Sequence, residues 1–318
     1  MREPAHIVGP VAGVDLASYF LHRGRLVDDA LELCLPPATQ HPAIIHEAMR
    51  YCVFAGGKRL RPILVLAGME AGGGDVPRAL PVACAVELIH TYSLIHDDLP
   101  AMDDSDTRRG RPTCHVVFGD AIAVLAGDAL HALAFNVIAQ MAETMGADRT
   151  VAVSREIAAA IGTEGMVGGQ VLDLLGEGRQ MRGRPSPVPP QPLTDAATQI
   201  HLRKTAALIR ASIRSGALLA GTEAQVLAAL TQYGERIGLA FQVVDDLLDV
   251  TGEEAKLGKH AHSDALRAKV TYPAAFGIER SRAIAAELTE EAIEALRPLG
   301  PAGVTLRDLA RYLLTRES

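Results

Sequence analysis

The sequence contains no tryptophan and few other aromatic residues. Aromatic side chains make up 4% of the 318 residues, although 48% of the chain is hydrophobic. The core must therefore be built from Ala, Leu, Val and Ile, which favours many closely packed helices over a β-sandwich. The length allows one large domain or two ordinary ones. We predict an all-α fold.

The sequence also has no CxxC pair, and we expect neither a signal peptide nor a membrane span. Without a CxxC pair, a reduced cytoplasmic setting fits best. The N-terminus has one early basic residue and an apolar part broken by Gly and Pro, which makes a poor signal peptide. No run approaches the roughly 18 to 20 apolar residues of a membrane span. The four cysteines are Cys34, Cys52, Cys84 and Cys114.

The charge balance excludes one broad class of partner. A net charge of −7 argues against a general nucleic-acid binder. We therefore expect a cytoplasmic protein without a membrane span, whose charged residues act in a local site.

The stretch HTYSLIHDDLPAMDDSDTRRG, residues 90–110, places five aspartates and two arginines directly after an apolar run. His90 and Asp97 are seven residues apart and fall within about 20° on a helix. Pro100 interrupts that helix, so we expect it to bend or loosen at residues 99–102. A carboxylate beyond the break, Asp103 or Asp104, could then turn back to the same cation. The alternative is an acidic helix end followed by a solvated loop.

A glycine-led turn, GGKRLRP, carries a second group of charges. Lys58, Arg59 and Arg61 follow Gly56 and Gly57 before the next helix. Lysine offers a compact charge and arginine a planar fork, so the group suits a diphosphate. The alternative is a helix cap with solvated charges.

Helical periodicity covers most of the rest of the chain. We expect helices at residues 15–35, 41–54 and 81–98, and one at 115–142 that is apolar almost all round. Such a helix is buried at the centre of a bundle or at a subunit interface. The last forty residues are typical of packing helices.

The segment GMVGGQVLDLLGEG places two polar groups, Gln170 and Asp173, on one helix face. They either hydrogen-bond within the core or line a cavity, and we favour the cavity. Residues 176–193 are rich in Gly, Arg and Pro and predict a loop. Because chemical motifs lie on both sides of it, we interpret it as an insertion within a single domain spanning residues 1–318.

A second acidic cluster, FQVVDDLLD, lies about 150 residues after the first. Asp245 and Asp249 are four apart, about 40° on a helix, with Asp246 on the flank. Their repulsion is most simply compensated by an external cation, and a site with few carboxylates suits Mg²⁺ bound together with a diphosphate. Further lysines and arginines imply a second anionic substrate held without metal.

These motifs together resemble the trans-isoprenyl diphosphate synthases, closest to the bacterial farnesyl diphosphate synthases. The resemblance covers about residues 45 to 280. It rests on GGKRLRP, DDLPAMDD with RRG, GGQVLDL, the Lys204–Thr205 pair, FQVVDDLLD, and GK with KVTYP. It implies a single large helical bundle with a central substrate cavity, the two Asp clusters facing each other across it, and a homodimer.

The resemblance also assigns roles to individual residues. Three Mg²⁺ would bridge the allylic diphosphate through Asp97, Asp98, Asp103, Asp245, Asp246 and Asp249, with Asp97 and Asp245 counted as catalytic. Charge for that diphosphate would come from Arg108, Lys204, Lys259 and Lys269. Isopentenyl diphosphate would be held by Lys58, Arg61, His90 and Arg109. Thr205 and Gln242 would turn oxygens towards the developing carbocation. His262 departs from the family pattern, where many relatives carry glycine.

The implied reaction is the condensation of isopentenyl diphosphate with an allylic diphosphate. Metal and cationic groups stabilise the departing diphosphate, and dry walls protect the cation. A terpene cyclase would not need the second anion site. A catalytically silent partner subunit would have decayed acidic motifs, whereas both are intact here.

The product length is expected to depend on residues just before Asp97. On the helix Ser93 lies about 40° from Asp97 and Tyr92 about 140°, so geometry places Tyr92 only at the flank. In the family an aromatic residue at this position, with the insertion Pro100–Ala101, accompanies farnesyl synthases. We therefore expect farnesyl diphosphate, with geranylgeranyl diphosphate as the alternative product.

Overall fold

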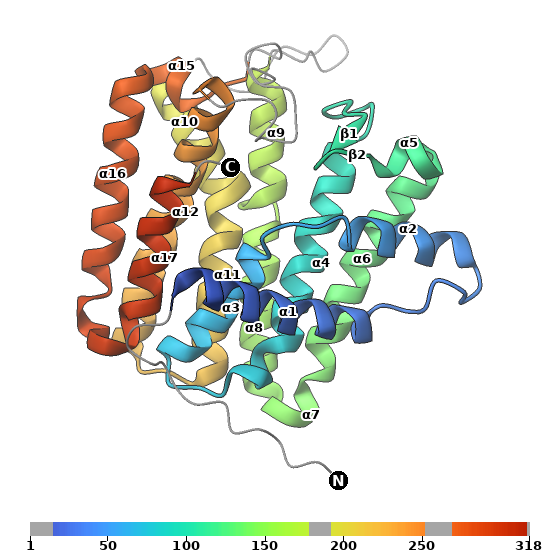
Figure 1. The fold of residues 1–318 in the computed structure, drawn as a ribbon, viewed down its shortest axis with the longest axis horizontal. Helices are drawn as coiled ribbons and strands as arrows, with labels where there is room; N and C mark the ends of the chain where they lie inside the picture. The colour runs from blue at the N-terminus through green and yellow to red at the C-terminus, as the bar shows by residue number, and fades with distance from the viewer. Residues whose placement is uncertain (1–14, 178–191, 252–268, 317–318) are drawn as a thin grey trace.

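The computed structural model describes residues 15–177, 192–251 and 269–316, and within them the chain is almost entirely helical. The axes of the long helices are roughly aligned with one another, and α1 and α2 lie across them (Figure 1). The helices are α1 (Leu16–Cys34), α2 (Ala43–Val53), α3 (Leu60–Ala71), α4 (Leu80–Asp97), α5 (Cys114–Phe118), α6 (Asp120–Gln140), α7 (Ala142–Met145), α8 (Ala147–Ile161), α9 (Met166–Gly176), α10 (Leu193–His201), α11 (Ala207–Ala220), α12 (Ala224–Thr251), α15 (Tyr272–Phe276), α16 (Ile278–Ala295) and α17 (Val304–Thr315). The all-α prediction is confirmed.

Short non-α elements complete the described chain. Two 3₁₀ segments occupy Val76–Ala79 and Arg297–Gly303, and a π-helical turn occupies Leu202–Ala206 between α10 and α11. Strands β1 (Thr107–Arg108) and β2 (Arg111–Pro112) pair antiparallel as a small hairpin, which was not predicted from the sequence.

The expected helices at residues 15–35, 41–54 and 81–98 are present, within two residues at each end. The expected helix at 115–142 is wrong in one respect, because Gly119 has φ 84° and divides it into α5 and α6. One side of α6 packs against α4 and α2, while Val124 and Leu125 on α6 stay 40% and 53% exposed. The core-helix interpretation therefore holds for only part of its surface.

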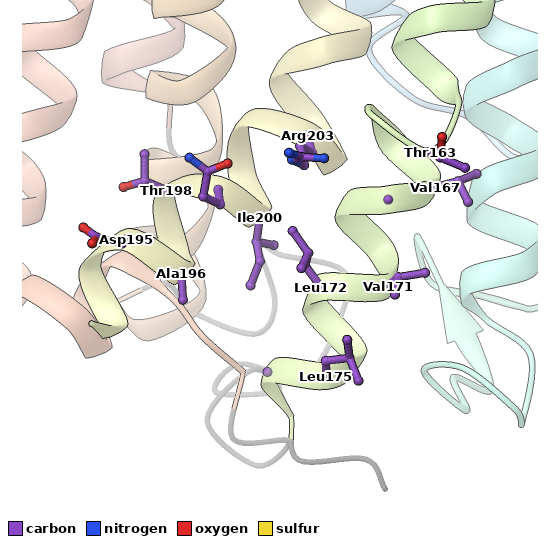
Figure 2. A pocket seen from close by; sticks show the side chains of 13 residues that line it. Thr163, Val167, Val171, Leu172, Leu175, Asp195, Ala196, Thr198, Ile200 and Arg203 are labelled. Atoms are coloured by element: carbon purple, nitrogen blue, oxygen red, sulfur yellow. The ribbon is translucent and has the colours of Figure 1, made fainter. Parts of the chain in front are cut away.

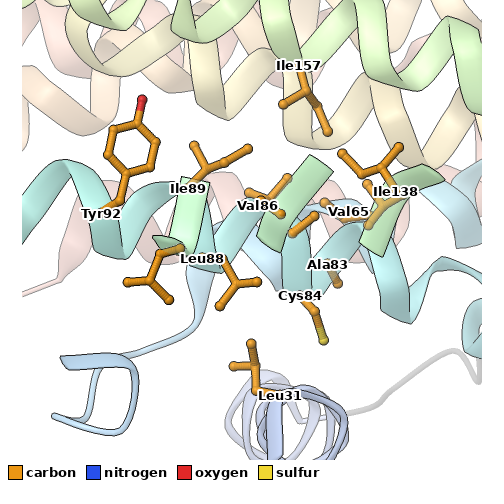
Figure 3. Close-up of a cluster of buried hydrophobic side chains, with 14 of the residues drawn as sticks. Leu31, Val65, Ala83, Cys84, Val86, Leu88, Ile89, Tyr92, Ile138 and Ile157 are labelled. Atoms are coloured by element: carbon orange, nitrogen blue, oxygen red, sulfur yellow. The ribbon is translucent and has the colours of Figure 1, made fainter. Parts of the chain in front are cut away.

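The first apolar core surrounds α4. Figure 3 shows Cys84 of α4 facing Leu31 of α1, with Ile138 of α6 and Ile157 of α8 approaching from other sides. A second core joins α3, α11, α12, α16 and α17. The side chains of both cores are overwhelmingly Ala, Val, Ile and Leu, as the composition predicted.

Two helical stretches, Val76–Asp97 and Asp120–Met145, are long and apolar enough to cross a membrane, which corrects the expectation that no run approaches that length. The first includes α4, and 67% of its most apolar window is buried among other helices; for the second the value is 39%. Length and composition alone are weak evidence for a span, because a core helix of a globular protein satisfies both.

The helices that carry the polar motifs approach each other closely at one end of the bundle. A Cβ on Gly169 of α9 would collide with the backbone of Lys204 in the π-helical turn. The missing side chain therefore lets α9 lie directly against that turn. This contact brings the GGQVLDL and Lys204–Thr205 motifs together near the end of α4 (Figure 1).

Candidate active site at the end of helix α4

The first carboxylate group forms where α4 ends. After Asp97 the chain coils back over the helix end, because the N–H of Met102 donates to the carbonyl of Leu99 and the N–H of Asp103 to that of Asp97, both at 2.8 Å. This is the predicted loosening after Asp98. It places the half-buried Asp103 beside Asp97, whereas Asp104 is exposed with φ 49°.

Asp98 points elsewhere and is paired with Arg108. The Arg108 guanidinium donates through Nε to both carboxylate oxygens at 3.0 Å and through Nη2 to Oδ1 at 2.7 Å. The β1–β2 turn presents this arginine: Arg109 and Gly110 both have positive φ, as a type I′ turn requires. Asp98, which was predicted to bind metal, and Arg108, which was predicted to bind diphosphate, are thus bound to each other.

Asp97 lies among opposing charges. Burial raises the pKa of Asp97 and the neighbouring carboxylate of Asp103 adds to the rise, while Lys204 and Arg108 oppose it. Lys204 donates to Asp173 at 2.5 Å, and Lys269 lies 3.5 Å from Asp103. Burial alone would lower the pKa of Lys204, but Asp173 and Asp97 outweigh burial and raise it. Asp97 and Asp103 therefore form a carboxylate pair with cations around it.

The second cluster, on α12, spreads its carboxylates in different directions. Asp245 lines the same cavity as Asp97, and its side chain is 44% exposed. Asp246 is 2% exposed and Asp249 is 1% exposed. Asp246 already accepts hydrogen bonds from three groups, so this arrangement gives no support to its predicted role as a metal ligand.

In the parts of the chain that the structure describes, no three His, Cys, Asp or Glu side chains are close enough together to hold a metal ion. The carboxylates that do reach the cavity are divided between its walls. Asp97 comes from α4 and Asp245 from α12. Any cation bridging the walls would need oxygen ligands from a bound molecule as well.

A second cavity of about 560 Å³ adjoins the first, which has a volume of about 570 Å³. The two cavities share Arg61, His90, Arg109, Phe241 and Asp245. The second is rich in cations: besides the two shared arginines, it is lined by Lys58, Arg59 and Arg316. Two cavities with cations in their linings therefore lie side by side; Asp97 lines the first, Glu87 the second, and Asp245 both.

The predicted cations of the glycine-led turn divide between binding and structure. Arg59, with φ 50°, is 6% exposed and is held by Asp28 at 2.8 Å, Glu87 at 2.7 Å and the carbonyl of Val53 at 2.8 Å. It fixes the turn to α1, α2 and α4. Lys58 and Arg61, its neighbours, line the cation-rich cavity as predicted.

His90 contacts Arg61, with 3.4 Å between its Nε2 and the Arg61 Nη1. Burial, and then the positive charges of Arg61 and Arg109, hold the pKa of His90 well below its usual value. Burial also lowers the pKa of Arg61 to about 10, although Glu87 and Asp245 oppose it. Both shifts come mainly from burial, and a bound anion would favour the charged form of each side chain.

Polar groups that could face a reacting carbon come from the π-helical turn and α12. The Thr205 hydroxyl donates to Gln242 Oε1 at 2.7 Å, and both residues line the first cavity. Gln170 also lines it, and its Oε1 is buried without a hydrogen-bond partner in the described structure. Gln170 and Asp173 of α9 were both expected to line a cavity. Gln170 does so, whereas Asp173 binds Lys204.

Tyr92 and Ser93 both line the first cavity. The Tyr92 ring is 8% exposed and stacks on His131 of α6, with 4.8 Å between ring centroids; Figure 3 shows it on α4 beyond Ile89. The Ser93 hydroxyl donates to the carbonyl of His90 at 2.8 Å. Tyr92 is therefore a wall of the cavity and not only its flank.

A further cavity of about 950 Å³ lies between α9 and α10. Figure 2 shows Leu172 and Ile200 facing each other across it. Its described lining is mostly apolar, with Asp195 and Arg203 as its charged members. In this described part of the lining, no group of charges converges that could bind a diphosphate.

Two residues of the site were not predicted from the sequence in the roles they take. Asp173 pairs with Lys204, and Arg316 lies 3.2 Å from Asp245 and over the ring of Phe241 at 4.0 Å. Arg316 belongs to no motif, so no signal in the sequence could have found it. Two predicted positions, Lys259 and His262, lie outside the described residues, as does most of the 176–193 loop.

Comparison with known proteins agrees with this geometry. Residues 42–298 match the family model for polyprenyl synthetase. The chain belongs to the polyprenyl synthetase family. It is accordingly a prenyltransferase with the all-α fold of that family.

Named relatives and solved structures extend over nearly the whole chain. A geranylgeranyl diphosphate synthase from Cyanophora paradoxa is 42% identical over 304 residues, covering 96% of this chain and 97% of the relative. The apo structure of an FPP/GFPP synthase from Zymomonas mobilis superposes with a TM-score of 0.79 at 36% identity, covering 95% and 100% of the two chains. A geranyltransferase from Helicobacter pylori, complexed with magnesium and isoprenyl diphosphate, has a TM-score of 0.79 at 32% identity, covering 96% and 98%.

Proposed function

We propose that this prenyltransferase joins isopentenyl diphosphate to an allylic diphosphate and releases geranylgeranyl diphosphate. The observation that carries the proposal is the pair of adjoining cavities of similar volume: Asp97 and Asp245 line the first from two helices together with Arg108 and Lys204, and the lining of the second includes five lysines and arginines. Two diphosphates held in different ways explain both. A terpene cyclase would leave the cation-rich cavity without a role.

The donor set of the first cavity fits magnesium. Carboxylates are hard oxygen ligands, and Mg²⁺ uses few of them together with substrate phosphate oxygens. Asp97 at the end of α4, Asp103 in the turn after it and Asp245 on α12 would hold it, and Asp98 would contribute once Arg108 is released. The family pattern predicts three ions. Bound metal would supply Lewis-acid stabilisation of the departing diphosphate.

The residues of the chain divide the remaining work between binding and charge stabilisation. Arg108, Lys204 and Lys269 would neutralise the allylic diphosphate as its bond to carbon breaks. Isopentenyl diphosphate would be held in the cation-rich cavity by Lys58, Arg61, His90 and Arg109. The oxygens of Thr205 and Gln242 would face the allylic cation, which the isopentenyl double bond attacks. Released diphosphate can accept the proton, so no nucleophilic Ser or Cys is needed.

The relatives favour geranylgeranyl diphosphate over the farnesyl product expected from the sequence, because the 42%-identical relative carries the geranylgeranyl name. Farnesyl diphosphate remains the second candidate product. Its support is Tyr92, which lines the cavity as a buried ring stacked on His131 and could stop the chain early. The 36%-identical structure is named as an FPP/GFPP synthase.

We also propose a cytoplasmic homodimer without a membrane span or a nucleic-acid partner. The apolar surface left open by α5 and α6 supports the dimer: Val116, Val117, Val124 and Leu125 are each 40% or more exposed. A second copy would cover them. Leu125→Glu should shift the protein to monomer in analytical ultracentrifugation, whereas a dimer unchanged by this variant would place the interface elsewhere.

The decisive experiment incubates the purified protein with Mg²⁺, isopentenyl diphosphate and dimethylallyl, geranyl or farnesyl diphosphate, and measures product length by chromatography. Conversion of farnesyl diphosphate to a C20 product is expected. Accumulation of C15 would establish the farnesyl alternative. Absence of transfer from every allylic substrate would indicate a silent partner subunit.

A further inference from the structure

Asp246 follows Asp245 directly on α12 but lies in a different environment. It is 2% exposed, and three donors converge on its carboxylate. Oδ2 lies 2.7 Å from His201 Nε2 and accepts the backbone N–H of Tyr272 at 2.9 Å, while Oδ1 accepts from Gln242 Nε2 at 3.1 Å. Because an ionised carboxylate offers only acceptors, each of these contacts requires the neighbour to donate.

The donors are themselves held in place. The His201 ring stacks on the Tyr272 ring, with centroids 5.3 Å apart and planes inclined by 25°. The Tyr272 hydroxyl lies 3.0 Å from the hydroxyl of Thr198 on α10. A metal ion at Asp246 would have to displace packed groups from α10 and from the start of α15. Asp245 lines the open cavity and its side chain is 44% exposed, so a metal ion there would compete with Arg316 at 3.2 Å and not with packed core groups.

The contact with Asp246 decides which way the Gln242 amide faces. A glutamine side chain has a donor end and an acceptor end. With its NH₂ turned to Asp246, its carbonyl oxygen must point the other way, where it accepts from Thr205 Oγ1 at 2.7 Å. Both Gln242 and Thr205 line the carboxylate cavity.

We propose that Asp246 is a positioning residue that fixes the Gln242 carbonyl oxygen towards the cavity where the allylic cation forms, and that it is not a metal ligand. The proposal rests on the prenyl transfer proposed above. A carbonyl dipole fixed in advance stabilises developing positive charge without reorganisation during the reaction. An amide free to turn would present its NH₂ to the cation for part of the time.

The test is Asp246→Asn, with Asp245→Asn as the matched control. The new amide can keep an oxygen towards His201 and Tyr272 only by turning its NH₂ to Gln242, which must then flip. We expect kcat at saturating Mg²⁺ to fall about 10- to 100-fold. Manganese binding, measured by electron paramagnetic resonance, should stay within about twofold of wild type, whereas Asp245→Asn should weaken it about tenfold or more. Equal weakening by both variants would overturn the proposal.

A double mutant separates positioning from a general structural effect. In a Gln242→Ala background, Asp246→Asn should lower kcat no further, because the group that it orients is gone. Losses that multiply would overturn the assignment. If circular dichroism shows that Asp246→Asn does not fold, His201→Phe is used instead, because it removes one donor and keeps a ring against Tyr272. A reduced kcat with unchanged manganese binding would support the proposal. An unchanged kcat would contradict it. Manganese binding is measurable without turnover, so an inactive wild type would refute the prenyl transfer alone.

Discussion

The two acidic clusters have similar compositions but are used differently. On α4 the cluster sits at a helix end, where the chain coils back and brings Asp103 beside Asp97. On α12 the cluster lies within a continuous helix of 28 residues, so each carboxylate points where the helix sends it. Asp245 reaches the cavity and Asp246 reaches the core.

The difference shows that side chains can come together where a helix ends, whereas within a helix consecutive side chains point in different directions. Consecutive residues on a helix point about 100° apart, so Asp245 and Asp246 cannot both face one ion directly. A loosened helix end has no such restriction. The number of aspartates in a motif is therefore a poor measure of the number of metal ligands.

The largest expected effect comes from removing Asp97 or Asp245, the carboxylates that line the first cavity from α4 and from α12. Asp97→Ala and Asp245→Ala should each lower turnover by about 10²- to 10³-fold, because each removes charge that holds the metal-bound diphosphate. Steady-state kinetics measures the change. The exposed Asp104→Asn is the matched control and should remain active, and excess chelator should abolish turnover in the wild type. Full activity in chelator would refute the metal-assisted mechanism.

Adjacent residues with different roles, Lys58 and Arg59, can also be compared at the proposed isopentenyl diphosphate site. Lys58→Ala and His90→Ala should weaken isopentenyl diphosphate about tenfold, because both residues line the cation-rich cavity. Calorimetric titration of each substrate measures the affinities. Weaker allylic binding with unchanged isopentenyl binding would show that the two anion sites are assigned the wrong way round.

Arg59 provides the comparison, since it is adjacent to Lys58 but buried against Glu87, which is 3% exposed. Arg59→Ala leaves that carboxylate without its ion-pair partner, so we expect a loss of about 3–5 kcal/mol in the free energy of unfolding. Denaturant unfolding measures this loss. A variant as stable as the wild type but deficient in isopentenyl binding would instead make Arg59 a ligand.

A smaller effect, on thermal stability, is expected at Asp97 of the first cluster in the metal-free protein. Burial raises the pKa of Asp97 above its unfolded value, so its contribution to stability is present at pH below about 4 and is lost as pH rises through the folded pKa. At pH 7 in chelator, Asp97→Asn should therefore raise the melting temperature by about 1–3 °C. The gain should disappear towards pH 4. A variant less stable than the wild type at pH 7 would show that ionised Asp97 stabilises the fold.

Much of the first cluster could be predicted because its information is local. Pro100 breaks the helix within a few residues of Asp97, so periodicity and proline chemistry together anticipate the folded-back carboxylate. The helix wheel could not choose between Asp103 and Asp104, because the choice depends on the path of the chain after the break. That path is fixed by backbone hydrogen bonds to Leu99 and Asp97.

The second cluster could be located from the sequence, but the environment of Asp246 could not. Its partners His201 and Tyr272 lie 45 and 26 residues away in the chain and meet it only through packing. Arg316 reaches Asp245 across 71 residues. Periodicity gives the direction of a side chain relative to its own helix and says nothing of what lies opposite.

The final prediction concerns product length and Tyr92, which lines the cavity on α4 shortly before Asp97, as Phe241 does on α12 shortly before Asp245. Tyr92→Ala should lengthen the product distribution by one isoprene unit or more, at a packing cost of about 3 kcal/mol because the ring stacks on His131. Tyr92→Phe keeps the ring and the stack, so its products should match those of the wild type. Chromatographic sizing of radiolabelled products measures both. If Tyr92→Ala and Tyr92→Phe give the wild-type distribution alike, another part of the cavity ends the chain.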